Sequence, residues 1–176
     1  MVFGFRMDKR EKYKEVMLMK TLVAYFSATE TTGAVATELA NAISADLYEI
    51  VPEALYTNED LNWRNKSSRS SVEMENETSR PAIGSAVVED MDQYELIFLL
   101  APIWWYEYPR IMETFLESYE LSGKKIVLIA TSGSSGFGKT VEKLRPSAPG
   151  AEFEEGIVLH SSRNVKKAIA VAEKYL

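Results

Sequence analysis

Short apolar runs alternate with stretches of helical periodicity along most of this chain. The runs at residues 21–26, 95–101 and 125–131 are nearly continuous, which predicts strands that are buried on both faces. Residues 46–51 alternate between apolar and polar, as a strand near a sheet edge would, and residues 156–160 form the last predicted strand. The pattern therefore predicts five strands.

Apolar residues at helical spacing lie between and after these runs. They predict helices over residues 31–44, 111–119, 137–144 and 163–176. Strands and helices thus alternate, and this order is typical of a parallel sheet with helices on both faces. We expect an α/β fold of the three-layer, doubly wound type.

Two segments depart from this rhythm. Residues 52–94 form a long polar connection, and connections of this length usually serve a function or contain a short helix of their own. Residues 1–18 carry five basic and three acidic residues and have no apolar stretch like that of a secretory signal. We interpret residues 1–18 as a disordered or surface extension and residues 19–176 as one domain.

The composition limits the kinds of chemical site that the chain can form. The 176 residues include no cysteine and one histidine, which excludes disulfides, thiolate-ligated clusters and thiol catalysis and disfavours zinc. Redox chemistry would then need a bound organic cofactor. The formal net charge of −6 argues against nucleic acid and favours partner proteins with basic surfaces. No apolar run is long enough to span a membrane, and we expect a cytoplasmic monomer or weak dimer.

Three loops that follow predicted strands carry the residue types of a ligand site, and in an open parallel sheet ligands bind outside the carboxyl ends of the strands. The first loop is Ser27-Ala28-Thr29-Glu30-Thr31-Thr32. Its four hydroxyls precede and open a predicted helix, where unpaired N–H groups suit a phosphate. Ordinary capping of the helix by one hydroxyl is the alternative interpretation.

The other two loops suit the remainder of a cofactor. The second is Pro102-Ile103-Trp104-Trp105-Tyr106, and three adjacent aromatic side chains that cannot all enter one core suit a flat ring. Core packing or a partner contact is the alternative. The third is Thr131-Ser132-Gly133-Ser134-Ser135-Gly136, whose small residues let the backbone approach a ligand closely. A flexible turn is the alternative.

Two further features have simpler interpretations. Residues 133–140 match the phosphate-loop pattern G-x-x-x-x-G-K-[ST] of nucleotide triphosphatases. The one strand predicted after Thr140 has no aspartate to hold magnesium, so we rank this function low. His160, the only histidine, has no visible catalytic partner, and we interpret it as a surface or capping residue.

Together the three loops resemble the flavodoxin family, specifically its short bacterial branch with a Pro-Ile-Trp-Trp loop. The resemblance runs from about Lys20 to Leu176 and includes the long connection, through Asn62-Trp63 and the serine-rich stretch at residues 67–71. It implies a five-stranded parallel sheet of order 2-1-3-4-5 and one bound FMN.

The resemblance also implies a role for each loop. Ser27, Thr29 and Thr32 would bind the FMN phosphate together with the backbone N–H groups of residues 28–32. Residues 102–106 would line the isoalloxazine ring, and residues 131–136 would form the third edge. The implied cofactor-binding residues are Ser27, Ala28, Thr29, Thr31, Thr32, Pro102, Ile103, Trp104, Trp105, Tyr106, Thr131, Ser132, Gly133 and Gly136.

One residue departs from the family pattern. Glu30 stands where the phosphate loop usually has glycine. A carboxylate facing the phosphate at a few ångströms would weaken binding by ~1 kcal/mol or more, and a positive φ at this position would add strain.

Three functions remain open. An FMN electron carrier is favoured, because no second dinucleotide fingerprint is present. The alternatives are an NAD(P)H-dependent FMN quinone reductase and a non-redox binding module that has lost FMN because of Glu30. In a carrier no side chain need act as a catalyst or metal ligand.

Overall fold

A computed structural model describes residues 20–176. The extension predicted at residues 1–18 lies outside these described residues. The strands form one parallel sheet in the order β2-β1-β3-β4-β5, which confirms the predicted fold class and strand order. The five strands are β1 (Lys20–Tyr25), β2 (Asp46–Glu49), β3 (Tyr94–Pro102), β4 (Lys125–Thr131) and β5 (Glu152–Leu159).

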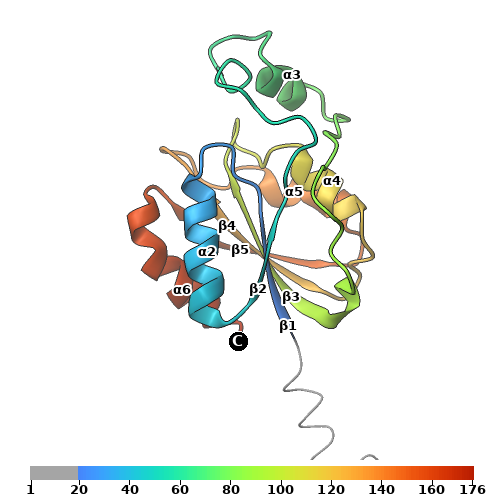
Figure 1. The fold of residues 1–176 in the computed structure, drawn as a ribbon, viewed down its shortest axis with the longest axis vertical. Helices are drawn as coiled ribbons and strands as arrows, with labels where there is room; N and C mark the ends of the chain where they lie inside the picture. Colours follow the sequence, from blue (N-terminus) through green and yellow to red (C-terminus); the bar gives the residue numbers. More distant parts are fainter. Residues whose placement is uncertain (1–19) are drawn as a thin grey trace, which may run out of the picture.

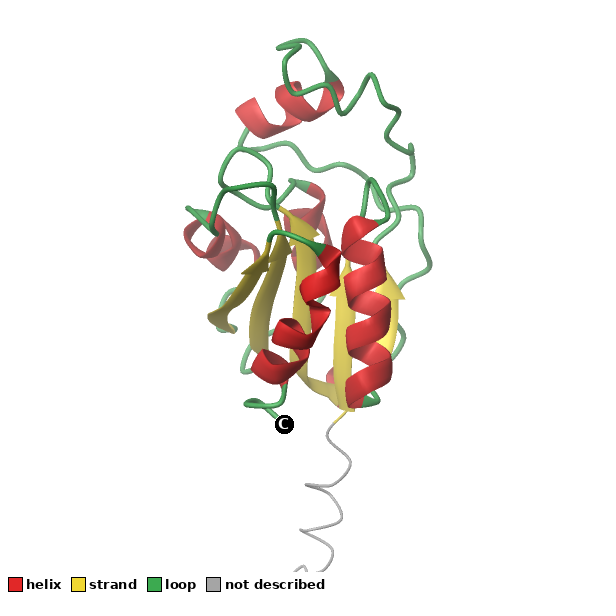
Figure 2. Ribbon diagram, turned by 90° about the vertical axis from the view of Figure 1, so that its left-hand side faces the viewer, coloured by secondary structure: helices red, strands yellow, loops and turns green. Residues whose placement is uncertain are grey.

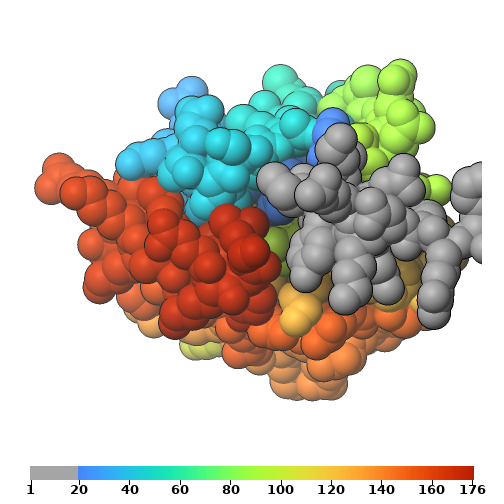
Figure 3. Space-filling model, turned by 90° about the horizontal axis from the view of Figure 1, so that it is seen from below, coloured from blue at the N-terminus to red at the C-terminus, as the bar shows by residue number. Residues whose placement is uncertain are grey.

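Helices cover both faces of the sheet (Figure 1, Figure 2). The helices α2 and α6 lie on one face, side by side as the view from below shows (Figure 3), and α4 and α5 lie on the other. The α-helices are α2 (Thr31–Ile43), α3 (Arg69–Glu75), α4 (Ile111–Glu117), α5 (Thr140–Leu144) and α6 (Val165–Ala172). Three short 3-10 helices are η1 (Met91–Gln93), η2 (Arg145–Ser147) and η3 (Ser162–Asn164).

The two cores follow directly from the period of two in a strand. In β1, Leu22 and Ala24 contribute to the core beneath α4, whereas Val23 and Tyr25 contribute to the core beneath α2 and α6. The strands β3 and β4 are central in the sheet and are buried almost throughout, as their continuous apolar runs predict.

The predicted boundaries of the last strand and of the last helix were wrong. The last strand begins at Glu152 rather than at residue 156, because its first half is rich in glutamate and reads as a loop. Such charged residues are usual on an edge strand, where they discourage pairing with other chains. Gly156 forms a bulge opposite β4, and a Cβ there would lie 2.7 Å from the Leu128 carbonyl oxygen. The last helix is also shorter than predicted, ending at Ala172.

The long connection after β2 leaves the body of the domain and returns to it. Backbone hydrogen bonds from Glu53 N to Ala82 O, at 2.9 Å, and from Gly84 N to Val51 O, at 2.7 Å, close its base. Its short helix α3 lies beyond the carboxyl ends of the strands (Figure 1). The connection therefore contains the helix that its length predicts and places it over the edge where ligands bind.

Tyr56 packs the long connection against residues at the ends of the strands. Its ring packs edge-on against Phe26 and Trp104, at centroid distances of 5.7 and 5.4 Å. Its hydroxyl donates to the Glu73 carboxylate at 2.5 Å, and the Arg69 guanidinium lies 3.9 Å from the ring centroid. Burial, followed by the bond to Glu73, raises the pKa of Tyr56 well above its ordinary value. The residue thus links α3 to the second loop.

A buried guanidinium provides the second attachment of the long connection. Arg110 is 2% exposed, and its Nη1 donates to Glu107 at 2.9 Å and to Glu113 at 3.1 Å. Its Nη2 donates to the Met74 carbonyl oxygen, the last turn of α3, at 2.8 Å. One side chain therefore joins the second loop, α4 and α3.

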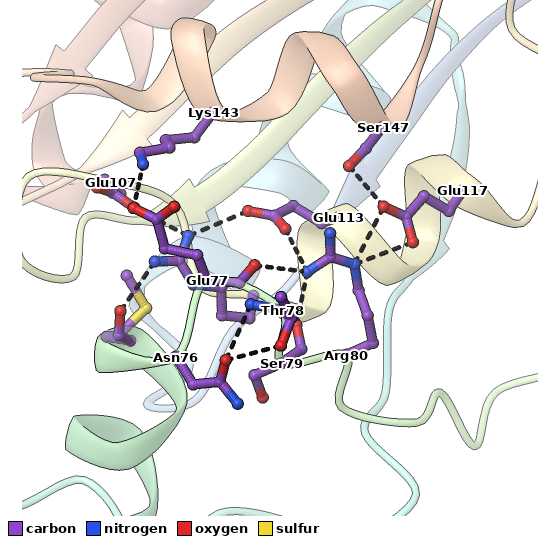
Figure 4. Close-up of polar contacts among 12 residues, drawn as sticks. Asn76, Glu77, Thr78, Ser79, Arg80, Glu107, Glu113, Glu117, Lys143 and Ser147 are labelled. Atoms are coloured by element: carbon purple, nitrogen blue, oxygen red, sulfur yellow. Dashed lines mark hydrogen bonds and ion pairs between the residues drawn. The ribbon is translucent and has the colours of Figure 1, made fainter.

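Arg80 extends this network to the surface (Figure 4). It pairs with Glu113 at 2.6 Å and with Glu117 at 2.9 Å, and Ser147 donates to Glu117 at 2.8 Å. Burial raises the pKa of Glu113 against the opposing effect of Arg80 and Arg110, whereas the hydrogen bond from Arg80 lowers the pKa of Glu117. The Lys143 ammonium pairs with Glu77. These contacts hold the segment after α3 against α4 and α5.

We expect replacement of Arg110 by methionine to lower the free energy of unfolding by about 3–5 kcal/mol, because Glu113 then remains buried with half its compensation removed. Urea denaturation followed by circular dichroism measures this loss. The double variant R110M/E113L should recover part of the loss, since it removes the uncompensated carboxylate together with its partner. A loss below ~1 kcal/mol in the single variant would contradict the role given to Arg110.

Candidate functional site

Two hollows meet at the carboxyl edge of the sheet. They share Ile103, Trp104, Ser132 and Gly133, so they adjoin each other, and we name the two together the edge groove. The larger part, about 550 Å³, is lined by Leu61, Trp63, Ser70, residues 103–106 and residues 132–135. The smaller part, about 320 Å³, is lined by Thr29, Thr31, residues 102–104, residues 131–133 and residues 159–161.

The second loop is a tight aromatic hairpin. Trp104 N donates to Glu107 O at 2.8 Å, and Glu107 N donates to Trp104 O at 3.0 Å. Trp105 and Tyr106 form the turn between them with φ values of 49° and 64°. Two successive positive φ angles define a type I′ turn, which asparagine and glycine normally occupy. Two bulky aromatics in this conformation store strain, a feature that is concentrated at functional sites.

The loop before α5 holds the aromatic hairpin in this shape. Lys139 N donates to the Tyr106 carbonyl oxygen at 2.9 Å. Gly138, at φ 55°, lies so close that a Cβ would be 2.3 Å from the same oxygen. Thr140 is fully buried and donates to Phe137 O at 2.6 Å. The Gly-Lys-Thr sequence that resembles a triphosphate loop therefore supports the hairpin, in keeping with the low rank given to that function.

The three aromatic side chains of the loop divide as expected. Trp104 is half-buried, and its ring meets Phe26 edge-on at 5.7 Å. Trp105 and Tyr106 are 43% and 66% exposed. Trp104 thus anchors the hairpin to the core, while the other two present aromatic surface along the edge groove.

The first loop places only part of its hydroxyls in the groove. Thr29 and Thr31 line the smaller part. Ser27 Oγ instead accepts a hydrogen bond from Gly33 N at 3.1 Å, which caps α2. The Thr32 and Thr131 hydroxyls are buried and bond each other at 2.8 Å. Among the predicted phosphate-binding hydroxyls, Thr29 and Thr31 are the two that line the groove.

Two other predicted residues, Ala28 and Gly136, are not among the residues that line either part of the groove. Ala28 is partly buried and packs against the core beneath α4. Gly136 is exposed and has open space where a Cβ would be. The remaining predicted residues of the second and third loops all line the groove.

Glu30 belongs to the first loop but lines a different hollow. Its φ of 62° confirms that this position takes the left-handed conformation that glycine prefers. Its neighbours in that hollow include Glu38, Glu49 and Tyr25. Burial, followed by the charge of Glu49, raises the pKa of Tyr25 to about 12. The first turn of α2 contains no acidic residue. Glu30 is thus not among the residues that line the groove, and the cost that the structure shows for it is the left-handed backbone conformation.

Sequence reasoning missed several lining residues. Ser70 is 2% exposed, and its Oγ has no hydrogen-bond partner within residues 20–176. His160 lines the smaller part, where its Nδ1 lies 3.0 Å from the Ser132 carbonyl oxygen. Trp63 and Ser70 belong to stretches of the long connection that the family resemblance includes, but the sequence assigned no role to either. The position of α3 brings both to the groove.

The groove combines features that suit a flat heterocycle joined to a phosphate. Its larger part has aromatic walls, a volume within the range of cofactor pockets, and one buried hydroxyl without a partner. Its smaller part lies at the beginning of α2, where backbone N–H groups and hydroxyls favour an anion. The two parts adjoin at four shared lining residues, so we expect that one molecule can occupy both.

A parallel sheet of order 2-1-3-4-5, with its cleft between the loops after β1 and β3, defines a flavodoxin-like protein. The chain belongs to the flavodoxin family, because the sequence profile described as Flavodoxin matches residues 20–174. None of the curated proteins to which the chain was compared is similar to it.

Solved structures agree with this assignment. An inferred flavoprotein from Bacteroides uniformis is 44% identical, with a TM-score of 0.79, over 86% of this chain and 98% of that one. Another from Bacteroides eggerthii is 43% identical, with a TM-score of 0.77, over 86% and 96%. A flavoprotein from Lactobacillus acidophilus, solved in complex with FMN, shares the fold at 21% identity and a TM-score of 0.64, over 85% and 97%.

Within residues 20–176, no helix has the length and apolar character to cross a membrane. The same residues contain no cluster of histidine, aspartate and glutamate side chains arranged to hold a metal ion.

We expect replacement of Glu30 by glycine to raise the free energy of unfolding by about 0.5–1 kcal/mol, because glycine removes the left-handed penalty of ~1–2 kcal/mol at the cost of some chain entropy. Urea denaturation measures the difference. Glu38, in the interior of α2, is the matched control, and its replacement by glycine should lower stability by ~1 kcal/mol. A fall in both variants would show that position 30 tolerates glutamate without strain.

Proposed function

We propose that this protein binds one FMN in the edge groove and uses it to carry electrons. The observation that carries the proposal is that the two parts of the groove adjoin, which sets an aromatic hairpin beside a hydroxyl-lined hollow at the beginning of a helix. Membership of the flavodoxin family supports the proposal, as does the FMN bound by the Lactobacillus acidophilus flavoprotein.

Each wall of the groove then has a role. Trp105 and Tyr106 lie against the isoalloxazine ring and exclude water from it, and the small residues at 132–135 approach its edge. Thr29 and Thr31 hold the phosphate, together with backbone N–H groups at the beginning of α2. FMN, when bound, supplies one- and two-electron redox chemistry.

Ser70 is the further residue that we assign to the ring. Its buried Oγ has no partner within residues 20–176, although a buried hydroxyl normally has one. A heteroatom of the flavin ring in the larger part of the groove would satisfy it. Tyr56 and Arg110 act indirectly, because they hold α3 and so position Ser70 at the groove.

The charge of the chain supports a carrier that docks with proteins. The formal net charge is −6, and the hollow beside the groove that contains Glu30, Glu38 and Glu49 is acidic. Such a surface attracts basic partners through long-range steering and repels nucleic acid. We therefore propose basic-surfaced redox proteins as the partners.

Titration of FMN-free protein with FMN tests the proposed cofactor. We expect saturable one-to-one binding with strong quenching of flavin fluorescence, because aromatic side chains contact the ring. Ser70→Ala should weaken binding about 2- to 12-fold, the equivalent of one hydrogen bond of ~0.5–1.5 kcal/mol. Ser118→Ala, on an exposed serine at the end of α4, is the control and should bind like wild type. Absence of saturable binding would remove the proposal and favour a non-redox binding module.

The second test separates a carrier from a reductase. We expect the FMN-loaded protein alone to leave NADPH unoxidised, and we expect its flavin to be reduced when a basic flavodoxin reductase is added. This reduction should slow as salt is raised, because charged surfaces are screened. Absorbance at 340 nm follows NADPH, and bleaching of the flavin follows reduction. Steady oxidation of NADPH by the isolated protein would instead identify a reductase.

A further inference from the structure

A third hollow lies beside the edge groove, on the side of the long connection. Its volume is about 590 Å³, and it shares Trp63 and Trp105 with the edge groove. We name it the flank hollow. Its other lining residues are Arg64, Lys66, Ser71, Met74 and Glu75. Trp63 and Trp105 therefore form the boundary between the flank hollow and the proposed FMN site.

The flank hollow offers aromatic surface to a ligand. Trp63 is 65% exposed and Trp105 is 43% exposed, an unusual amount of open indole for a folded chain. The Arg64 guanidinium lies 5.0 Å from the Trp63 ring centroid. A planar ring can stack on such indoles, and the adjacent guanidinium can stack with them.

The charge of the flank hollow is opposite to that of the chain as a whole. Arg64 and Lys66 form no ion pair with another residue in the range 20–176. Glu75 is the one carboxylate among the lining residues. The lining therefore carries two positive charges and one negative charge, although the chain has a formal net charge of −6. This local excess of positive charge attracts a negatively charged group.

Local hydrogen bonds fix the segment that carries these cations. Asn62 Oδ1 accepts from Arg64 N at 3.2 Å, and Asn65 Oδ1 accepts from Ser67 N at 2.9 Å. Ser71 Oγ donates to the Asn65 carbonyl oxygen at 2.8 Å, which ties this turn to α3. The segment is therefore arranged before any ligand arrives, which lowers the entropic cost of binding.

We propose that the flank hollow binds a planar aromatic molecule that carries a negative charge. Its ring would stack on Trp63 and Trp105, and its anionic group would face Arg64 and Lys66. The inference rests on the proposed function in one respect, since the same two indoles would place this ligand beside the FMN. A sulfonated or carboxylated quinone and a nicotinamide dinucleotide both have this chemistry, and the experiment distinguishes them; binding of the dinucleotide beside FMN would favour the reductase over the carrier.

Calorimetric titration of the FMN-loaded protein tests the proposal, with anthraquinone-2-sulfonate in one arm and NADPH in the other. We expect one probe molecule per chain to bind in at least one arm, and the arm that shows binding identifies the kind of ligand. The variant R64E/K66E should weaken that binding at least tenfold. The control K166E/K167E makes the same change of charge on α6, which packs on one face of the sheet and does not line the flank hollow. It should bind the probe within twofold of wild type.

The same titrations on FMN-free protein keep this inference separate from the proposed function. If FMN fails to bind, the FMN proposal falls, but the probe and the charge variants still report on the flank hollow. Binding in neither arm would overturn the inference, as would equal binding by R64E/K66E and wild type. Displacement of the probe by added FMN would also overturn it, because the probe would then occupy the edge groove. Circular dichroism establishes that each variant is folded.

Discussion

The buried contacts of Arg110 are the constraint on which the candidate site depends. One guanidinium, 2% exposed, bonds to the end of the aromatic hairpin through Glu107, to α4 through Glu113, and to α3 through the Met74 carbonyl. Removing a buried cation from two carboxylates and a carbonyl is costly, so these three elements stay together in the folded state. The long connection becomes a fixed wall, because its helix cannot leave without exposing this charge network (Figure 4).

The aromatic hairpin forms the other wall of the site, and neighbouring backbone holds it in a strained conformation. Trp105 and Tyr106 take a turn conformation that suits glycine and asparagine, and the backbone at residues 138–139 packs against the Tyr106 carbonyl to hold them there. The result is aromatic surface at the carboxyl edge instead of in the core. That surface serves two neighbouring hollows, since Trp105 lines both the edge groove and the flank hollow.

Local patterns were enough to predict a parallel sheet with helices on both faces and the three loops at the sheet edge, whereas the strand order came from the family resemblance. Strand periodicity located β3 and β4 because both are buried on two faces, and the glutamates of β5 hid its first half. The phosphate loop was predicted from its hydroxyls, and composition alone does not reveal that Ser27 also accepts from Gly33 N or that Thr32 pairs with Thr131. Ser70 and Arg110 depend on contacts between residues far apart in sequence, so no local signal identified them.

A crystal structure of the chain grown with FMN measures most directly where a ring and a phosphate bind. We expect the isoalloxazine ring along the aromatic hairpin, with Ser70 Oγ within hydrogen-bond distance of a ring heteroatom, and the phosphate beside Thr29 and Thr31 with the Glu30 carboxylate turned away. Density for the flavin in the flank hollow, or for the phosphate in the acidic hollow that Glu30 lines, would contradict this assignment.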